Sequence, residues 1–193
     1  MRITGGVWRG RKLNGPEGQG AGAAIRPTSD RLRESLFNIL THAFGDPLSG
    51  AHVIDLFAGA GALGLEALSR GARFALLVDN GAEARALIRA NVEALGCGGA
   101  TRVFRRDAAK LGAAPSGERF SVAFLDPPYG KGLAEAALAG LRDGGWLTEG
   151  ALCIVEETGD AQITPPPGFE QVDRRAYGAT QLLIVRRVLE GGA

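Results

Sequence analysis

Asp126-Pro127-Pro128-Tyr129 is the stretch whose residue types are best suited to chemistry, and it follows the apolar run Phe120–Leu125. Such a run is typical of a buried strand, and in open α/β sheets ligands bind beyond the carboxyl ends of strands. Neither proline has an N–H to give a sheet, so the backbone must leave the strand here. The Asp126 carboxylate and the Pro127 carbonyl could accept hydrogen bonds from the two N–H groups of a planar amine, and Tyr129 could stack on the face of the ring that carries this amine. The alternative to a binding site is a proline turn that ends the strand, in which Asp126 is only a capping residue.

The second stretch is a glycine loop, Gly59-Ala60-Gly61-Ala62-Leu63-Gly64, which matches G-x-G-x-x-G. Asp79 follows Gly59 by twenty positions, where a carboxylate that binds a ribose is expected. Taken alone, this spacing favours a nicotinamide dinucleotide. Asp55 lies just before the loop, however, where it would repel a pyrophosphate and attract a cation. S-adenosylmethionine carries an ammonium and a sulfonium but no phosphate, so we expect this cofactor instead.

Three carboxylates would each bind one part of S-adenosylmethionine. Asp55 would attract the charged methionine end. Asp79 would accept hydrogen bonds from the ribose hydroxyls, and Asp107 would accept one from the adenine amine. The alternatives are a buried capping carboxylate for Asp55 and a turn residue for Asp107. The residues expected to bind the cofactor are Asp55, Phe57, Gly59, Gly61, Gly64, Asp79, Asp107 and Ala108.

The composition fits one globular domain, with 193 residues of which 45% are hydrophobic and 22% charged. No segment has the apolar length of a membrane span and the first residues do not open a signal peptide, so we expect a cytoplasmic protein. Cys97, Cys153 and the two histidines form no recognisable ligand pattern. We therefore expect neither a disulfide nor a metal site.

The net charge of +1 is distributed unevenly along the chain. Residues 1–33 carry seven bases and two acids, which leaves 15 bases and 19 acids, a net charge of −4, for the remainder. A basic end on a mildly acidic body predicts binding to a polyanion, and a solvated, charged edge strand is the alternative. The side chains expected to hold phosphates are Arg9, Arg11, Lys12, Arg26, Arg31 and Arg33.

The elements that would position these residues begin with a β-hairpin. Residues 2–4 and 7–13 flank a tight turn at Gly5-Gly6, and a glycine-rich linker follows. We expect residues 1–24 to form this hairpin and linker, and residues 25–193 to form the main domain.

In the main domain, strands and helices alternate from His52 onward. This alternation predicts a mostly parallel sheet covered by helices on both faces. The last two strands are separated by only a short turn, so they should pair antiparallel. The predicted strands are 52–57, 73–78, 101–105, 120–125, 152–156, 169–175 and 181–188, and the helices 29–43, 63–69, 82–95 and 133–141.

Two motifs together resemble class I S-adenosylmethionine-dependent amino-methyltransferases: Asp55-Leu56-Phe57-Ala58-Gly59-Ala60-Gly61 and Asp126-Pro127-Pro128-Tyr129. Residues 5–13, 26–31, 36–38 and 61–71 are more specifically similar to the RsmD family, and the likeness runs over nearly the whole chain. One departure is Asp79-Asn80-Gly81, where the family usually has Glu-x-Asp, so the ribose contact depends on the shorter Asp79.

The resemblance implies a Rossmann-like class I methyltransferase, with a seven-stranded sheet, a C-terminal antiparallel hairpin and an N-terminal β-hairpin extension. It implies methylation of a guanine N2 in 16S rRNA, with Asp126, Pro127 and Tyr129 catalytic and phosphates held by the basic residues. We expect a monomer that acts on a small-subunit assembly, without metal or membrane. DNA adenine N6 or a protein glutamine is an alternative acceptor, and a non-catalytic RNA-binding ribosome-assembly module is an alternative of another class.

Overall fold

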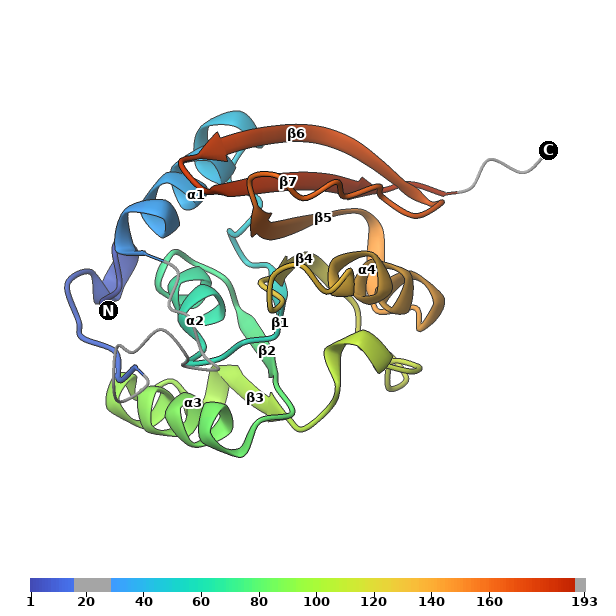
Figure 1. Ribbon diagram of the computed structural model, residues 1–193. Helices are drawn as coiled ribbons and strands as arrows, with labels where there is room; N and C mark the ends of the chain where they lie inside the picture. Colours follow the sequence, from blue (N-terminus) through green and yellow to red (C-terminus); the bar gives the residue numbers. More distant parts are fainter. Residues whose placement is uncertain (16–28, 190–193) are drawn as a thin grey trace.

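A seven-stranded sheet in the order β3-β2-β1-β4-β5-β7-β6 forms the centre of the computed structural model, which describes residues 1–15 and 29–189 (Figure 1). Neighbours from β3 to β5 pair parallel, and β7 lies antiparallel between β5 and β6. The strands are β1 (His52–Leu56), β2 (Phe74–Val78), β3 (Thr101–Phe104), β4 (Phe120–Leu125), β5 (Leu147–Thr158), β6 (Phe169–Tyr177) and β7 (Thr180–Arg187).

Helices cover both faces of the sheet because successive side chains of a buried strand point to opposite faces. Val53 of β1 belongs to the cluster that packs against α1, α2 and α3, whereas Ile54 and Leu56 belong to the cluster against α4. The helices are α1 (Asp30–Ala43), α2 (Ala62–Ser69), α3 (Ala82–Leu95) and α4 (Leu133–Asp143). Within the described part of the chain, no helix combines the length and the apolar character needed to span a bilayer.

The chain changes direction at β1, and this change places the site. From β1 the chain runs outward through β2 and β3, and then returns to β4 on the other side of β1. At such a switch point the loops beyond the carboxyl ends of the two strands diverge and leave a crevice. The segments after β1 and β4, which carry the two motifs, therefore open into the same crevice.

The predicted mostly parallel sheet with its C-terminal hairpin is confirmed, with one large difference in length. β5 begins at Leu147, five residues before its predicted start. The additional residues include Gly150 at φ +74°, and the pairing with β4 is irregular between Phe120 and Val122. Glycine is typical of turns and uncommon within strands, so the sequence around Gly150 did not indicate that the strand had already begun.

The predicted N-terminal hairpin has its antiparallel pairing but a different turn. The Ile3 N–H donates to the Arg11 carbonyl at 2.9 Å, and the Leu13 N–H donates to the Met1 carbonyl at 3.1 Å. Residues 1–15 contain the 3-10 helix η1 (Gly6–Trp8) and a single antiparallel bridge, Arg2 to Lys12, rather than two strands around a Gly5-Gly6 turn. Gly6 lies against α2, where an added Cβ would be 1.8 Å from the Ser69 carbonyl oxygen. This docking occupies the expected turn, so the chain reverses through η1 instead. Most of the predicted linker lies outside the described residues.

Candidate active site

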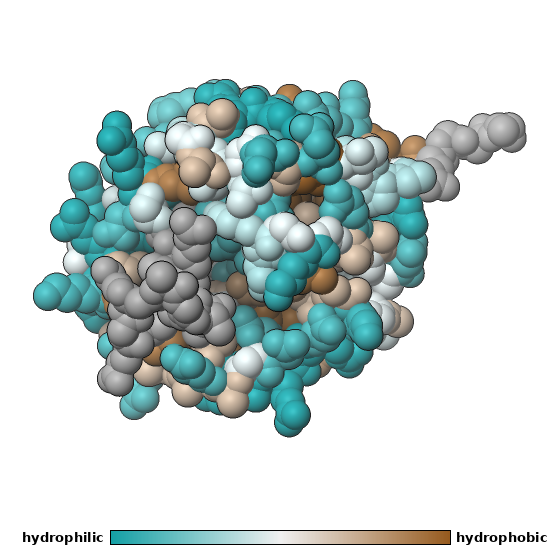
Figure 2. All heavy atoms as spheres, in the orientation of Figure 1, coloured by the Kyte–Doolittle hydropathy of each residue, from teal (hydrophilic) through white to brown (hydrophobic). Residues whose placement is uncertain are grey.

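A cavity of about 870 Å³ opens at the carboxyl ends of β1, β2 and β4. Its lining includes Asp55, Asp79, the first residues of the glycine loop and all of Asp126-Pro127-Pro128-Tyr129. Figure 2 shows that hydrophilic side chains dominate this face of the molecule, with a recess near its centre. The two motifs identified in the sequence therefore share one cavity, and the segment after β4 is open to the glycine loop.

The glycine loop lines the cavity at Gly59 and Ala60, and several residues in and before it have positive φ. Gly61 does not line the cavity, since a Cβ there would lie 3.4 Å from side-chain carbons of the core. Gly59 has φ +56° and Gly61 φ +79°, and Phe57, a non-glycine residue, has φ +59°. Positive φ is uncommon for a residue with a side chain and is found at functional sites. Gly64 has a different role, since a Cβ there would lie 2.3 Å from Leu77 Cδ2 and 3.3 Å from Asp55. Its missing side chain lets α2 pack closely against β1 and β2.

Asp55 is a buried carboxyl group within β1, with only 1% of its surface exposed. Its Oδ2 accepts a hydrogen bond from the Gly64 N–H at 2.9 Å, so it fixes the start of α2. Burial raises the pKa of Asp55 to about 8; the Gly64 hydrogen bond opposes this rise and the Asp79 charge adds to it. A cation bound beside Asp55 would favour its ionised form. The expected capping contact and a ligand contact are thus compatible.

Asp79 fastens the glycine loop to the end of β2. Its Oδ2 accepts from the Gly59 N–H at 2.9 Å, and its Oδ1 accepts from the Gly81 N–H at 2.7 Å. The twenty-residue spacing between Gly59 and Asp79 thus corresponds to a direct contact. Each carboxylate oxygen has a second lone pair, so Asp79 can still accept from a hydroxyl group.

Asp107 and Ala108 lie at a small recess beside the main cavity. This recess, about 30 Å³ in volume, also borders Phe57 and Asp79. Asp107 accepts from the Ala109 N–H at 3.0 Å and thereby caps the 3-10 helix η3 (Ala108–Lys110). The recess continues the lining of the main cavity past β2, where an adenine ring was expected.

The segment after β4 is held by contacts to β1 and β5. The Asp126 N–H donates to the Leu56 carbonyl at 3.5 Å, which extends the ladder by one residue before Pro127 ends it. The Tyr129 hydroxyl donates to Oε1 of Glu156 at 2.8 Å. Burial, together with the Glu156 carboxylate, raises the pKa of Tyr129 above its usual range. The ring is therefore a neutral phenol held in place beside Asp126.

Glu156 is a cavity residue that the sequence reasoning missed. It is 5% exposed, belongs to β5 and lines the same cavity as Asp126 and Tyr129. The signal was present, because two acids, Glu156-Glu157, directly follow the apolar run Leu152–Val155. Glutamate is rarely buried without a partner, so two acids at the end of a buried strand indicate a site where their side chains have polar contacts.

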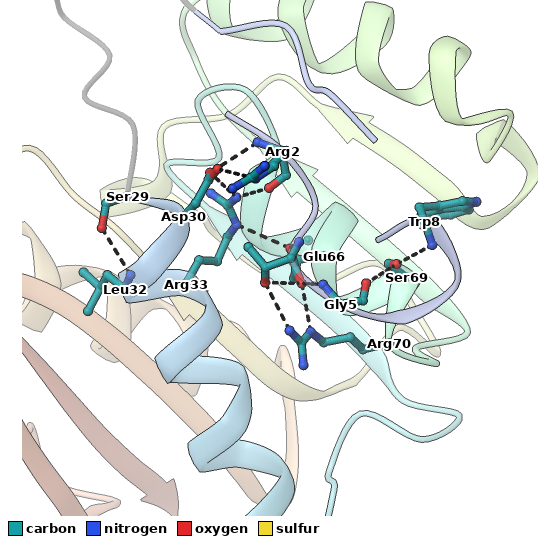
Figure 3. Close-up of polar contacts among 12 residues, drawn as sticks. Arg2, Gly5, Trp8, Ser29, Asp30, Leu32, Arg33, Glu66, Ser69 and Arg70 are labelled. Carbon is teal, nitrogen blue, oxygen red and sulfur yellow. Dashed lines mark hydrogen bonds and ion pairs between the residues drawn. The ribbon is translucent and has the colours of Figure 1, made fainter. Parts of the chain in front are cut away.

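Arg33 was expected to hold phosphates, and this prediction is wrong. The side chain is fully buried, with Nε 3.4 Å from Glu66 Oε2 and Nη2 2.8 Å from Asp30 Oδ1. Its Nη2 also donates to the Arg2 carbonyl (Figure 3). Arg33 thus ties α1 to the N-terminal segment and is enclosed by protein on all sides.

Glu66 is the centre of this cluster (Figure 3). It is fully buried in α2, and its carboxylate accepts from the backbone N–H groups of Thr4 and Gly5, both at 2.8 Å. Arg70 Nε donates to it at 2.8 Å. A lone glutamate in the apolar helix Leu63-Gly64-Leu65-Glu66-Ala67-Leu68 was the sequence signal. The N-terminal segment is therefore docked on the helix that the glycine loop begins.

The other expected phosphate-binding residues lie at the surface. Arg9, Arg11, Lys12 and Arg31 are exposed, and Arg11 Nη2 donates to the Ala94 carbonyl at 2.7 Å. Arg26 lies outside the described residues. Among residues 1–15 and 29–189, no group of three potential ligands is arranged to hold a metal ion.

Comparisons with known proteins agree over almost the whole chain. A family model described as conserved hypothetical protein 95 matches residues 1–186. The ribosomal RNA small subunit methyltransferase D of Escherichia coli K12 is 39% identical, covering 99% of this chain and 92% of that protein. The protein of the same name from Haemophilus influenzae is 33% identical, covering 92% and 89%. The solved structure of yhhF from Escherichia coli has a TM-score of 0.81 at 33% identity and covers 98% and 99%.

Proposed function

Because the chain belongs to the family described as conserved hypothetical protein 95, the RsmD family, we propose that it transfers a methyl group from S-adenosylmethionine to N2 of a guanine in 16S rRNA. The fold is that of class I methyltransferases, and relatives are named for ribosomal RNA of the small subunit. The observation that carries the proposal is the single cavity shared by the glycine loop and Asp126-Pro127-Pro128-Tyr129. An amine-binding site thus adjoins a site suited to a cationic cofactor.

The residues around the glycine loop fit S-adenosylmethionine. Asp55 offers a buried carboxyl group to the charged methionine end, and Gly59, which has positive φ and lines the cavity, brings the backbone close without a side chain. Asp79 would accept from the ribose hydroxyls, and Asp107, at the small recess beside the cavity, would accept from the adenine amine. When bound, S-adenosylmethionine supplies an electrophilic methyl group on a sulfonium.

Asp126, Pro127 and Tyr129 would orient the acceptor amine. The lone pair of guanine N2 is delocalised into the ring, so this amine is a poor nucleophile even though it is neutral rather than an ammonium. Hydrogen bonds from its two N–H groups to the Asp126 carboxylate and the Pro127 carbonyl favour a pyramidal nitrogen whose lone pair points at the methyl group. Tyr129 would stack on the base, and Asp126 or solvent would accept the proton released after transfer.

A guanine reached in this way must leave its stack, which costs least in a single-stranded loop. The exposed Arg9, Arg11, Lys12 and Arg31 would hold the neighbouring phosphates. Since Glu66 docks the N-terminal segment on α2, Arg9, Arg11 and Lys12 belong to a segment that is held against the helix of the glycine loop. We expect the protein to act as a monomer on RNA within a small-subunit assembly.

Transfer of a labelled methyl group tests the proposal. Small subunits and naked 16S rRNA from cells that lack the gene are incubated with the protein and labelled S-adenosylmethionine, and the RNA is digested to nucleosides. We expect label in N2-methylguanosine. Binding of RNA without transfer to either substrate would favour a non-catalytic assembly module.

A further inference from the structure

Glu156 places a second carboxylate beside the proposed acceptor site, in addition to Asp126. We propose that Glu156 accepts a hydrogen bond from the ring N1–H of the acceptor base, and thereby makes the site selective for guanine. This inference rests on the proposed function, and it assigns to one residue the choice among planar amines.

The register of the sheet brings the two carboxylates together. Leu125 of β4 pairs with Val155 of β5, so Asp126 and Glu156 each follow by one residue on neighbouring parallel strands. Neighbouring strands lie about 4.8 Å apart, which is a suitable separation for recognising adjacent groups of one small ring. Both residues line the cavity.

Tyr129 connects Glu156 to the stacking surface. The phenol hydroxyl donates to Glu156 Oε1 at 2.8 Å, so the Glu156 carboxylate lies at the edge of the ring on which the base would stack. An ionised carboxylate can accept about four hydrogen bonds. The contact with Tyr129 therefore orients Glu156 and leaves it capacity to accept another N–H group.

The donor pattern of guanine matches a pair of carboxylates. Its Watson–Crick edge presents the N2 amine next to N1–H, which are adjacent donors. Adenine presents the N6 amine next to an N1 lone pair, and a glutamine amide presents its amine next to a carbonyl oxygen. With the amine held by Asp126, either of these would turn a lone pair toward Glu156. A site that forms a hydrogen bond with a substrate N–H group can react about 10⁴-fold more slowly with an analogue that lacks this group.

Glu157 provides a matched control on the same strand. It is also buried, at 3% exposure, but its Oε1 accepts from the backbone N–H groups of Gly130 at 3.3 Å and Thr158 at 2.9 Å. It is absent from the lining of the main cavity. Glu157→Gln therefore removes the charge of a neighbouring buried glutamate, as Glu156→Gln does, but leaves the lining of the cavity unchanged.

The test compares two RNAs that differ only at the acceptor base, once that guanine has been located by mass spectrometry. One RNA keeps guanine, and the other carries 2-aminopurine, which has the same exocyclic amine but a lone pair at N1. For each protein the ratio of single-turnover rates on the two RNAs is measured, because this ratio does not depend on the folded fraction. If turnover is too slow, competition binding gives the ratio of affinities for the two RNAs, which reports the loss of the N1–H contact in the bound state.

The wild-type protein and Glu157→Gln should both prefer guanine by about 100-fold or more. Glu156→Gln should lose about 10- to 100-fold in rate on guanine. Its preference should fall to within a few-fold, since the glutamine amide can donate to N1 of 2-aminopurine. An unchanged preference in Glu156→Gln, or a wild-type protein indifferent to the two bases, would overturn the inference. A wild-type protein that methylates no guanine would overturn the proposed function itself.

Discussion

Replacing Asp55 by Asn should remove a pH-dependent penalty from the stability of the ligand-free protein. The Asn side chain keeps an oxygen for the Gly64 N–H but cannot ionise. In the wild-type protein burial raises the pKa of Asp55 from 3.8 to about 8, so between these values the folded state holds a proton that the unfolded chain releases. The free energy of unfolding therefore falls as pH rises through this window.

The size of this effect follows from the shift in pKa. Four pH units correspond to about 5 kcal/mol at 1.36 kcal/mol per unit, which is the most that the wild-type protein could lose by pH 8. Urea unfolding at pH 5 to 9 should show Asp55→Asn gaining on the wild-type protein as pH rises. Equal pH dependence in the two proteins would refute the assignment of the raised pKa to Asp55.

The same substitution should weaken the binding of S-adenosylmethionine. A cation beside Asp55 favours its ionised form, so in the wild-type protein binding releases a proton below about pH 8. The affinity should rise by up to about tenfold per pH unit toward that value, and Asp55→Asn should lack this component. Isothermal titration calorimetry in buffers of different ionisation enthalpy measures the proton release directly. The same release in both proteins would show that Asp55 does not contact the cationic end.

Three other variants test separate parts of the mechanism and the fold. Asp126→Ala should lower methyl transfer by about 100- to 1,000-fold and leave the affinity for S-adenosylmethionine nearly unchanged by calorimetry; equal activity would remove Asp126 from the mechanism. Glu66→Ala leaves buried bases without their carboxylate and should cost about 3–5 kcal/mol in urea unfolding, whereas a loss below 1 kcal/mol would contradict the docking role. Neutralising Arg9, Arg11 and Lys12 together should reduce the salt slope of RNA binding by about 0.7 per lost phosphate contact, and an unchanged slope would assign these residues to folding only.

The sequence predicted the meeting of the two motifs because each directly follows a strand. The carboxyl ends of parallel strands lie on one edge of a sheet, so order along the chain was enough to place Asp126 near the glycine loop. The place of Asp79 at the end of the neighbouring strand could be predicted for the same reason, whereas its hydrogen bond from the Gly59 N–H was found only in the structure. The two predicted features depend on local patterns and on topology alone.

The errors concern residues whose environment is set by distant partners. Arg33 precedes the buried Leu36, Phe37 and Leu40 at helical spacing and so lies on the buried face of α1, although its charge suggested a surface position. Its partner Glu66 lies 33 positions away, so the sequence alone did not reveal the pair. The N-terminal turn was misplaced because Gly6 is required by contact with Ser69 rather than by a hairpin. The acids after the run Leu152–Val155 were visible in the sequence, but the position of Glu156 beside Asp126 depends on the register between β4 and β5, which the sequence does not give.

The most direct test is nucleoside mass spectrometry of 16S rRNA from three strains: one with the gene, one without it, and one complemented with Asp126→Ala. The proposed function predicts one N2-methylguanosine that is present in the first strain and missing from the other two. If all three strains carried the same set of N2-methylguanosines, this cavity would not be a guanine N2 methylation site in 16S rRNA.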